Sequence, residues 1–262
     1  MGSEMCIRDR VDARVPISSR NPDIDELGKN KARLILLNKS DLAEDKWNDA
    51  WSEYFREKGF SVVKVNSKKG GGIKSINGVI QEACKEKIER DRKRGILNRP
   101  VRAMVVGIPN VGKSTFINAL AGKACAKTGN KPGVTKGKQW IRLNKNVELL
   151  DTPGILWPRF EDQAVGLKLA FIGSIKDEIL QTEELAAELV KFMNENYPGV
   201  LENKYNVEED TDPYGMLEKI AESRHCLVRG NELDTEKASV LLMDDFRNGR
   251  LGKLTLEYPD AY

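Results

Sequence analysis

The chain has 262 residues, of which 32% are charged and 40% hydrophobic, as expected for a globular protein rather than a disordered or fibrous one. No apolar run reaches the ~18 residues of a membrane-spanning helix. The net charge of +3 is unevenly divided: residues 1–175 carry 33 Lys and Arg against 20 Asp and Glu, and residues 176–262 carry 10 against 20. A basic first part favours a polyanionic partner such as RNA, although basic residues could also only complement a bound nucleotide.

The first ten residues show neither a strand nor a helix period, and they lack the apolar core of a signal peptide. We therefore expect residues 1–10 to be a non-native leader and recognisable sequence to begin near Val11.

After this leader, apolar runs alternate with amphipathic segments. The runs at 33–37, 60–65, 101–106, 139–143 and 147–150 read as strands, the last two as a hairpin. Helical spacing follows at 46–58, whose aromatic residues we expect in the core, at 73–94 and at 114–120. This alternation predicts an α/β domain at 11–175, with a mostly parallel sheet and helices on both faces.

From about residue 175 only helical spacing remains, at 182–196, 214–226 and 235–248. Thr182, Asp212 and Asp234 are suitable N-cap residues for these helices. We expect a small all-helical C-terminal domain at 176–262.

The strand at 101–106 runs into the pattern G-x-x-x-x-G-K-S, which begins at Gly107 and ends at Ser114 and is typical of a phosphate-binding loop. Such a loop turns its backbone N–H groups towards phosphate oxygens, while Lys113 adds a positive charge and Ser114 binds Mg²⁺. The residues expected to contact the nucleotide are Asn110, Val111, Gly112, Lys113, Ser114 and Thr115.

Two later segments fit the same site. Asp151-Thr152-Pro153-Gly154 has the form D-x-x-G, in which Asp151 holds Mg²⁺ and the Gly154 N–H approaches the γ-phosphate. Thr135 lies between the two motifs and is expected to close on Mg²⁺ and the γ-phosphate. Lys113, Thr135 and Gly154 are thus the candidate catalytic residues. A simple turn is the alternative for each of these two segments.

Guanine recognition is indicated by Asn38-Lys39-Ser40-Asp41, which has the form N-K-x-D. The Asp41 carboxylate can accept two hydrogen bonds from the guanine edge, and adenine offers no such donor pair. Asn38 would fasten neighbouring loops, and the Lys39 side chain would lie over the base. Asn66 and Ser67 stand where a further base-binding loop is expected, although their match to a motif is loose.

The order of these motifs is inverted, because N-K-x-D precedes the phosphate-binding loop. This order indicates a circularly permuted GTPase. Ile155 follows D-x-x-G, where many GTPases carry a glutamine that orients the attacking water. Together with Asn110, this substitution resembles GTPases that bind K⁺ beside the phosphates, although Asn110 could instead only brace the loop.

The motif order resembles the YlqF/RbgA family of circularly permuted ribosome-biogenesis GTPases. The remaining matching segments are Asp12-Ala13-Arg14-Val15-Pro16, Ser18-Ser19-Arg20-Asn21-Pro22 and Pro132-Gly133-Val134-Thr135. The resemblance implies a cytoplasmic GTPase with GTP or GDP and Mg²⁺ as cofactors, which assembles the large ribosomal subunit. Its low intrinsic activity would be stimulated by the subunit, and its partners would be the subunit precursor and its rRNA. The resemblance also implies that the helical C-terminal domain at 176–262 binds RNA. We expect a monomer and no membrane association.

The resemblance also implies an N-terminal segment with a Pro-Gly-His stretch, which nothing in residues 1–10 matches. The only histidine of the chain, His225, falls in the helical domain and is expected to be structural. Two alternatives remain open. One is an RNA-binding module whose guanine nucleotide is only structural, and the other is a permuted GTPase that acts on another RNA.

Overall fold

The structure is a computed structural model, and it describes residues 6–29, 31–96, 100–122, 139–143, 145–154, 156, 162–175 and 181–262. The chain divides into two compact units. The first, the sheet unit, comprises Met1–Asp162 together with Thr255–Tyr262. The second, the helical unit, comprises Gln163–Leu254.

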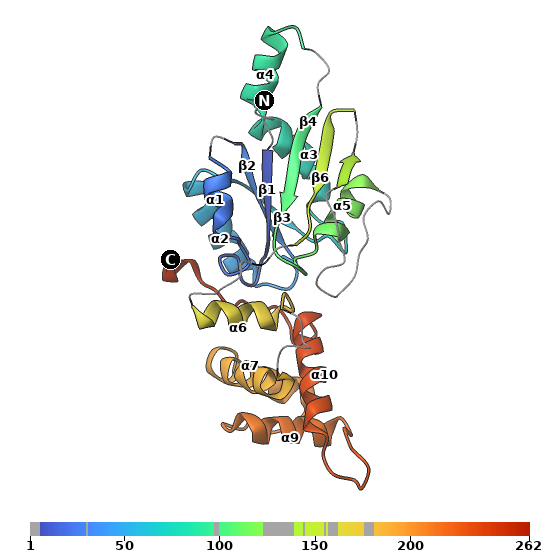
Figure 1. Cartoon of the computed structure of the whole chain (residues 1–262). Helices are drawn as coiled ribbons and strands as arrows, with labels where there is room; N and C mark the ends of the chain where they lie inside the picture. Colours follow the sequence, from blue (N-terminus) through green and yellow to red (C-terminus); the bar gives the residue numbers. More distant parts are fainter. Residues whose placement is uncertain are drawn as a thin grey trace. The chain divides into compact units, whose positions relative to one another are not determined.

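The sheet unit contains a six-stranded sheet in the order β3-β2-β1-β4-β6-β5 (Figure 1). Its strands are β1 Cys6–Asp12, β2 Arg33–Asn38, β3 Ser61–Val65, β4 Val101–Val106, β5 Gln139–Arg142 and β6 Val147–Asp151. All neighbouring strands are parallel except β5, which runs antiparallel to β6. The predicted mostly parallel sheet is therefore confirmed, and its parallel strands end at one common edge.

Strand β1 differs from the sequence-based expectation. Residues 6–10 belong to this central strand, which pairs with both β2 and β4, so the sheet begins before Val11. Strand pairing uses backbone groups that every sequence provides, so the missing period did not prevent it. The side chains remain unusual for a buried parallel strand, because Asp9 and Arg10 are both buried. That residues 1–10 are a non-native leader stays a prediction.

Helices cover both faces of the sheet, as predicted (Figure 1). They are α1 Asp23–Leu27, α2 Asp45–Glu57, α3 Ile73–Ala83, α4 Lys85–Lys93 and α5 Lys113–Ala121. Successive side chains of β2 point to opposite faces. Leu36 therefore packs in a core with residues of α3 and α5, whereas Leu37 packs in a core with residues of α2. Trp51 and Phe55 of α2 are fully buried, which confirms the predicted role of these aromatic residues.

The single helix predicted at 73–94 is divided at Cys84 into α3 and α4. Ile73, Ile76 and Ile80 hold α3 against the sheet. In α4 only Asp91 is buried, and most of its side chains are charged. The break thus separates a packed helix from one that is largely solvated.

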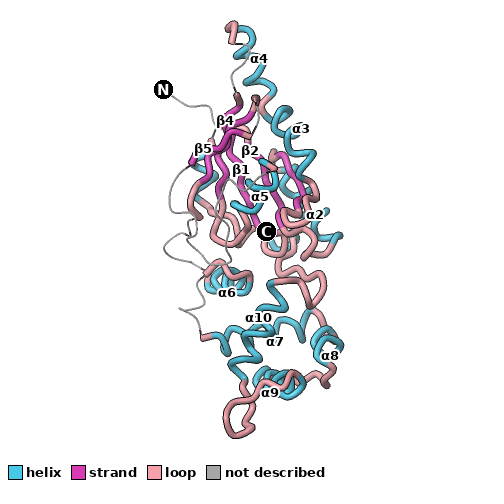
Figure 2. The backbone as a smooth tube through the Cα atoms, turned by 90° about the vertical axis from the view of Figure 1, so that its right-hand side faces the viewer, coloured by secondary structure: helices cyan, strands magenta, loops and turns pink. Residues whose placement is uncertain are grey.

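The helical unit is built from α6 Gln163–Phe171, α7 Thr182–Asn196, α8 Val200–Tyr205, α9 Pro213–Ser223 and α10 Thr235–Arg247 (Figure 2). Asp212 and Asp234 accept hydrogen bonds from backbone N–H groups at the starts of α9 and α10, as predicted for N-caps. Thr182 is instead the first residue of α7, and Gln181 is its N-cap. Within the described residues, no helix is both long and apolar enough to cross a bilayer.

The helical unit begins and ends earlier than the domain expected at 176–262. Its first helix, α6, starts before residue 176, and the last eight residues of the chain belong to the sheet unit. In this tail, the Leu256 N–H donates to the Arg14 carbonyl at 2.9 Å, and the short 3₁₀-helix η2 Pro259–Ala261 follows. These long-range contacts explain the difference, because no local pattern reveals them.

Arg10 provides a test of the unusual strand. Its side chain is fully buried, and its Nη atoms donate to the Ser67 hydroxyl and, at 3.5 Å, to the Lys113 carbonyl oxygen. Its Nε has no partner among the described residues, and burial lowers the pKa of its guanidinium against the opposing effect of Asp12. We expect Arg10→Met to raise the free energy of unfolding by about 1–3 kcal/mol, because a buried charge is replaced by an apolar side chain of similar length.

Urea denaturation of the parent protein and of Arg10→Met measures this difference in the free energy of unfolding. Arg102→Met on β4 is the control, because Arg102 is half exposed and should shift stability by no more than about 0.5 kcal/mol. A variant of Arg10 less stable than the parent would contradict the interpretation.

Candidate functional site

The phosphate-binding loop connects β4 to α5 and requires its two glycines. Gly107 and Gly112 have φ angles of +147° and +86°. A Cβ atom on Gly107 would lie 2.6 Å from the Arg10 carbonyl oxygen, and one on Gly112 would lie 2.9 Å from Nδ2 of Asn38. Only glycine fits at both positions, so the loop can curve tightly against its neighbours.

Lys113, at the start of α5, is enclosed by its own loop. Its Nζ donates to the carbonyl oxygens of Gly107 at 2.7 Å and of Ile108 at 2.8 Å. Burial lowers the pKa of Lys113 to about 8, while the nearby carboxylate of Asp151 opposes this shift. The loop therefore concentrates backbone dipoles and one cation where a phosphate group could replace the carbonyl partners.

The D-x-x-G segment lies beside this loop because β6 pairs in parallel with β4, with Asp151 opposite Val105. Asp151 is buried, its Oδ1 has no hydrogen-bond partner in the described residues, and burial raises the pKa of its carboxyl group. A Cβ atom on Gly154 would lie only 2.7 Å from Nζ of Lys113. The backbone at Gly154 thus closely approaches the phosphate-binding loop.

Asn38 joins the two motifs that the sequence presents in inverted order. It is the last residue of β2, and its Nδ2 donates to the Val111 carbonyl oxygen at 2.6 Å. Its Oδ1 accepts from the Ser67 hydroxyl at 2.9 Å. The N-K-x-D segment, the phosphate-binding loop and the loop after β3 therefore meet at the carboxyl edge of the sheet, which is where α/β proteins bind their ligands.

The two base-contacting candidates beside Asn38 differ in their surroundings. Asp41 is only partly buried, so its carboxylate is accessible to a ligand. Lys39 has a φ angle of +56°, and its Nζ lies 2.8 Å from Oδ2 of Asp12. Burial lowers the pKa of Lys39, and Asp12 opposes this effect.

Asp12 and Arg14 form a buried ion pair that the separate motifs of the sequence did not predict. Arg14 donates from Nε and Nη2 to the two Asp12 carboxylate oxygens, both at 2.9 Å. Burial by itself raises the pKa of Asp12, but Arg14 and Lys39 outweigh it and hold that pKa far below its ordinary value. The signal in the sequence was the D-x-R spacing at the end of β1.

The remaining predicted residues are placed unequally. Ser67 is buried beside Asn38, whereas Oδ1 of Asn66 accepts from the Lys69 N–H at 2.9 Å within its own turn. Asn110, with a φ angle of +60°, Ser114 and Thr115 lie in the loop and the first turn of α5, all partly buried. Thr135 and Ile155 lie outside the described residues.

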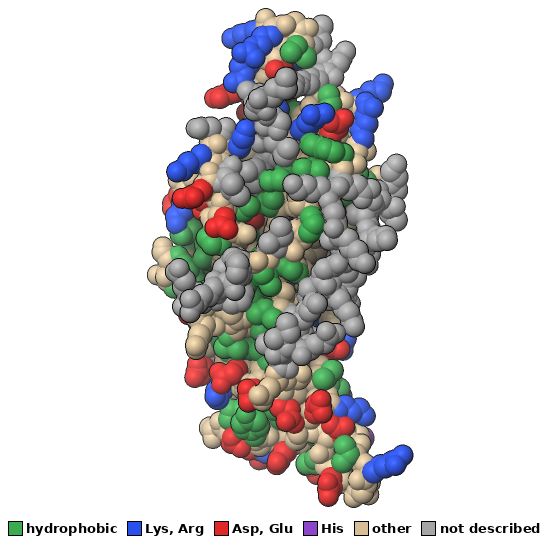
Figure 3. Space-filling view, viewed as in Figure 1, with side chains coloured by type: hydrophobic (Ala, Val, Ile, Leu, Met, Phe, Trp, Pro, Cys, Tyr) green, Lys and Arg blue, Asp and Glu red, His purple; other side chains and the backbone are tan. Residues whose placement is uncertain are grey.

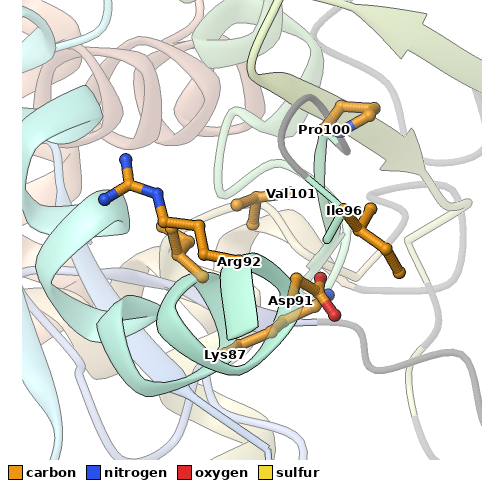
Figure 4. A pocket seen from close by; sticks show the side chains of 7 residues that line it. Lys87, Asp91, Arg92, Ile96, Pro100 and Val101 are labelled. Carbon is orange, nitrogen blue, oxygen red and sulfur yellow. The ribbon is translucent and has the colours of Figure 1, made fainter. Parts of the chain in front are cut away.

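A small pocket lies at the opposite end of β4 from this site, next to α4 (Figure 4). Its lining residues are Lys87, Ile88, Asp91, Arg92, Ile96, Pro100 and Val101. Because Val101 begins β4 and the phosphate-binding loop follows its last residue, this pocket is separate from the candidate nucleotide site.

Comparisons with known proteins agree with this arrangement. A family model described as a 50S ribosome-binding GTPase matches residues 102–224, so the match starts in β4 and omits the three strands that precede it in this chain. The structure is similar to YlqF from T. maritima in its GNP-bound form, with a TM-score of 0.67 at 27% identity over 97% of this chain and 93% of that one. The GDP-bound form gives a TM-score of 0.68, with 95% of that chain covered.

Two relatives found by sequence share more identical residues with the chain than these solved structures do. The chain is 48% identical over 253 residues to ribosome biogenesis GTPase A of Bacillus cereus, covering 96% of this chain and 86% of that protein. It is 45% identical to the protein of the same name from Bacillus licheniformis, covering 95% and 89%. The inverted motifs meet at one edge of the sheet, as nucleotide binding requires. The chain therefore belongs to the ribosome biogenesis GTPase A family and is a GTPase that binds guanine nucleotides.

Proposed function

We propose that this GTPase assists the assembly of the large ribosomal subunit and that its nucleotide state controls its association with the subunit precursor. The observation that carries the nucleotide part is the Asn38 side chain, which bonds to the phosphate-binding loop at Val111. The ribosomal part rests on the relatives, which are named ribosome biogenesis GTPase A.

In this proposal the base lies at Asn38, Lys39 and Asp41, with Ser67 beside them. The partly buried Asp41 residue offers its carboxylate to the two guanine donors, which adenine does not offer as a pair. Asn66 precedes Ser67 in this loop, and its side-chain oxygen accepts from the Lys69 N–H and so holds the turn.

The phosphates lie in the loop of Asn110 to Thr115. Lys113 exchanges its two carbonyl partners for phosphate oxygens, and the Gly154 N–H donates to the γ-phosphate. Lys113 and Gly154, with Thr135, are the residues that we propose to act on the reacting phosphate.

The donor set fits Mg²⁺, because Oδ1 of Asp151 is a buried anionic oxygen without a partner in the described residues. Ser114, Thr135 and Asp151 would hold the ion. When bound, it would neutralise charge on the terminal phosphates. We further propose Asn110 as a ligand of K⁺ beside the same phosphates.

The residue after D-x-x-G is Ile155, whose apolar side chain cannot orient a water molecule. In this proposal the protein alone hydrolyses GTP slowly, and the ribosomal particle stimulates the hydrolysis. It also places the protein in the cytoplasm as a monomer.

Helix α4 supports an RNA partner. Of its nine residues, five are basic and three acidic, and Arg94 follows directly; the basic residues are Lys85, Lys87, Arg90, Arg92 and Lys93. Lys and Arg side chains gather over this helix in Figure 3. Such a face fits the phosphates of a folded RNA, so we propose that α4 contacts rRNA.

Sedimentation with large-subunit precursors tests the function as a whole. We expect more protein in the particle fraction with a non-hydrolysable GTP analogue than with GDP. Equal association in both states would contradict nucleotide control, and tight GTP binding without stimulated turnover would favour a structural nucleotide.

Guanine recognition predicts a change of base preference. In Asp41→Asn one acceptor becomes a donor, so we expect GTP affinity to fall about 100-fold and xanthosine triphosphate, whose C2 carbonyl accepts that donor, to bind better. Calorimetry measures both affinities. Asp45→Asn, at the exposed first residue of α2, should change neither.

Asp151→Asn tests the metal site. We expect GTP hydrolysis to fall by about 10²–10³-fold, because the amide is a much weaker ligand for Mg²⁺ than the carboxylate. Phosphate release is measured together with the Mg²⁺ dependence of GDP affinity. Glu148→Gln, on the same strand but partly exposed, is the control. An unchanged Mg²⁺ dependence in Asp151→Asn would refute the assignment.

The rRNA surface is tested by removing two charges. We expect Lys93→Ala with Arg94→Ala to weaken rRNA binding and to reduce the slope of log affinity against log salt by about 1–2. The slope falls because fewer phosphates are neutralised, so fewer counterions leave the RNA on binding. Lys46→Ala with Lys58→Ala removes the same charge from exposed positions at the two ends of α2. If both double variants lose the same slope, α4 is no specific contact.

A further inference from the structure

The C-terminal tail, Thr255–Tyr262, is anchored on the sheet unit by backbone and ring contacts. The Trp51 Nε1 donates to the Glu257 carbonyl oxygen at 3.0 Å, and the rings of Trp47 and Tyr258 lie 4.8 Å apart, edge to face. The Glu44 N–H donates to the Thr255 hydroxyl at 3.2 Å. The tail is thus tied to helix α2 and to the turn before it.

Glu257 is the only carboxylate of this tail that is buried, at 2% exposure. It accepts from the N–H of Ile17 at 2.8 Å, from the N–H of Ser18 at 3.1 Å, and from the Ser18 hydroxyl. A carboxylate is buried at an acceptable cost only when such donors surround it. Glu257 therefore fixes the loop that follows β1.

That loop leads directly to the base site. The Asp12 N–H donates to the Ser19 hydroxyl at 2.9 Å, next to the residue that Glu257 holds. Asp12 in turn bonds Nζ of Lys39 at 2.8 Å. The tail also touches Arg14 directly through the Leu256 N–H, and Arg14 clamps the Asp12 carboxylate. Two short routes therefore connect the tail to the lysine of the N-K-x-D motif.

We propose that the C-terminal tail is a positioning element of the guanine site. Glu257 fixes the 15–19 loop, this loop and Arg14 orient Asp12, and Asp12 holds Lys39 in the position from which its side chain covers the base. The inference rests on the proposed roles of Lys39 and Asp41 in base binding. By linkage, a bound guanine nucleotide holds the tail in place to the same extent.

The test measures GDP affinity with a fluorescent analogue in the full-length protein. We expect Glu257→Gln to weaken binding about tenfold, because the amide presents a donor group to donors in the loop. Ser18→Ala, on the loop side of the contact, should weaken it in the same direction. Asp260→Asn is the matched control, an exposed acidic residue of the same tail that should leave affinity unchanged.

A double-mutant cycle separates positioning from mere stabilisation. If Glu257 acts through Lys39, the losses in GDP affinity caused by Glu257→Gln and Lys39→Ala do not add when the two are combined. Additive losses, or wild-type affinity in Glu257→Gln, would overturn the inference. Asp41→Asn keeps the two proposals apart: unchanged guanine preference in that variant refutes the base site itself, whereas lost preference together with additive Glu257 effects refutes only the role of the tail.

Discussion

The side-chain amide of Asn38 is the interaction on which the site depends. Its Nδ2 donates to the phosphate-binding loop, and its Oδ1 accepts from Ser67. The N-K-x-D segment, the phosphate-binding loop and the loop after β3 are therefore held together at one buried side chain. An amide buried without these partners would cost about 1–3 kcal/mol. Parallel strands end at the same edge of a sheet whatever their order in the chain. The inverted motif order therefore leaves the geometry of the site intact.

Buried charge is handled differently in two parts of β1. At its end, Asp12 is surrounded by Arg14 and Lys39, which together keep the carboxylate ionised. Three and two residues earlier, the charges of Asp9 and Arg10 are not each surrounded by two opposite charges. Burial raises the pKa of Asp9 to about 6 although Arg20 opposes it, and Nε of Arg10 has no partner within the described part of the chain. The same strand thus contains a carboxylate held by two cations, Asp12, and a buried cation without an ion pair of this kind, Arg10.

The sequence predicted what is encoded locally. The phosphate-binding loop, D-x-x-G and N-K-x-D are short patterns whose residues act within a few positions of one another, and the strands before them are short runs of mostly apolar residues. Long-range contacts could not be read in this way. The anchoring of the tail by Glu257 joins residues 239 positions apart, and the Asp12–Lys39 pair joins the end of β1 to the residue that follows β2. Strand β1 was missed because its place is set by two neighbouring strands and not by its own side chains.

Lys113 also ties the phosphate-binding loop to itself. Its ammonium group donates to two carbonyl oxygens of its own loop, so the position of the charge and the curvature of the loop depend on each other. Replacing Lys113 would therefore remove a positive charge from the loop and also leave two of its carbonyl oxygens without this donor.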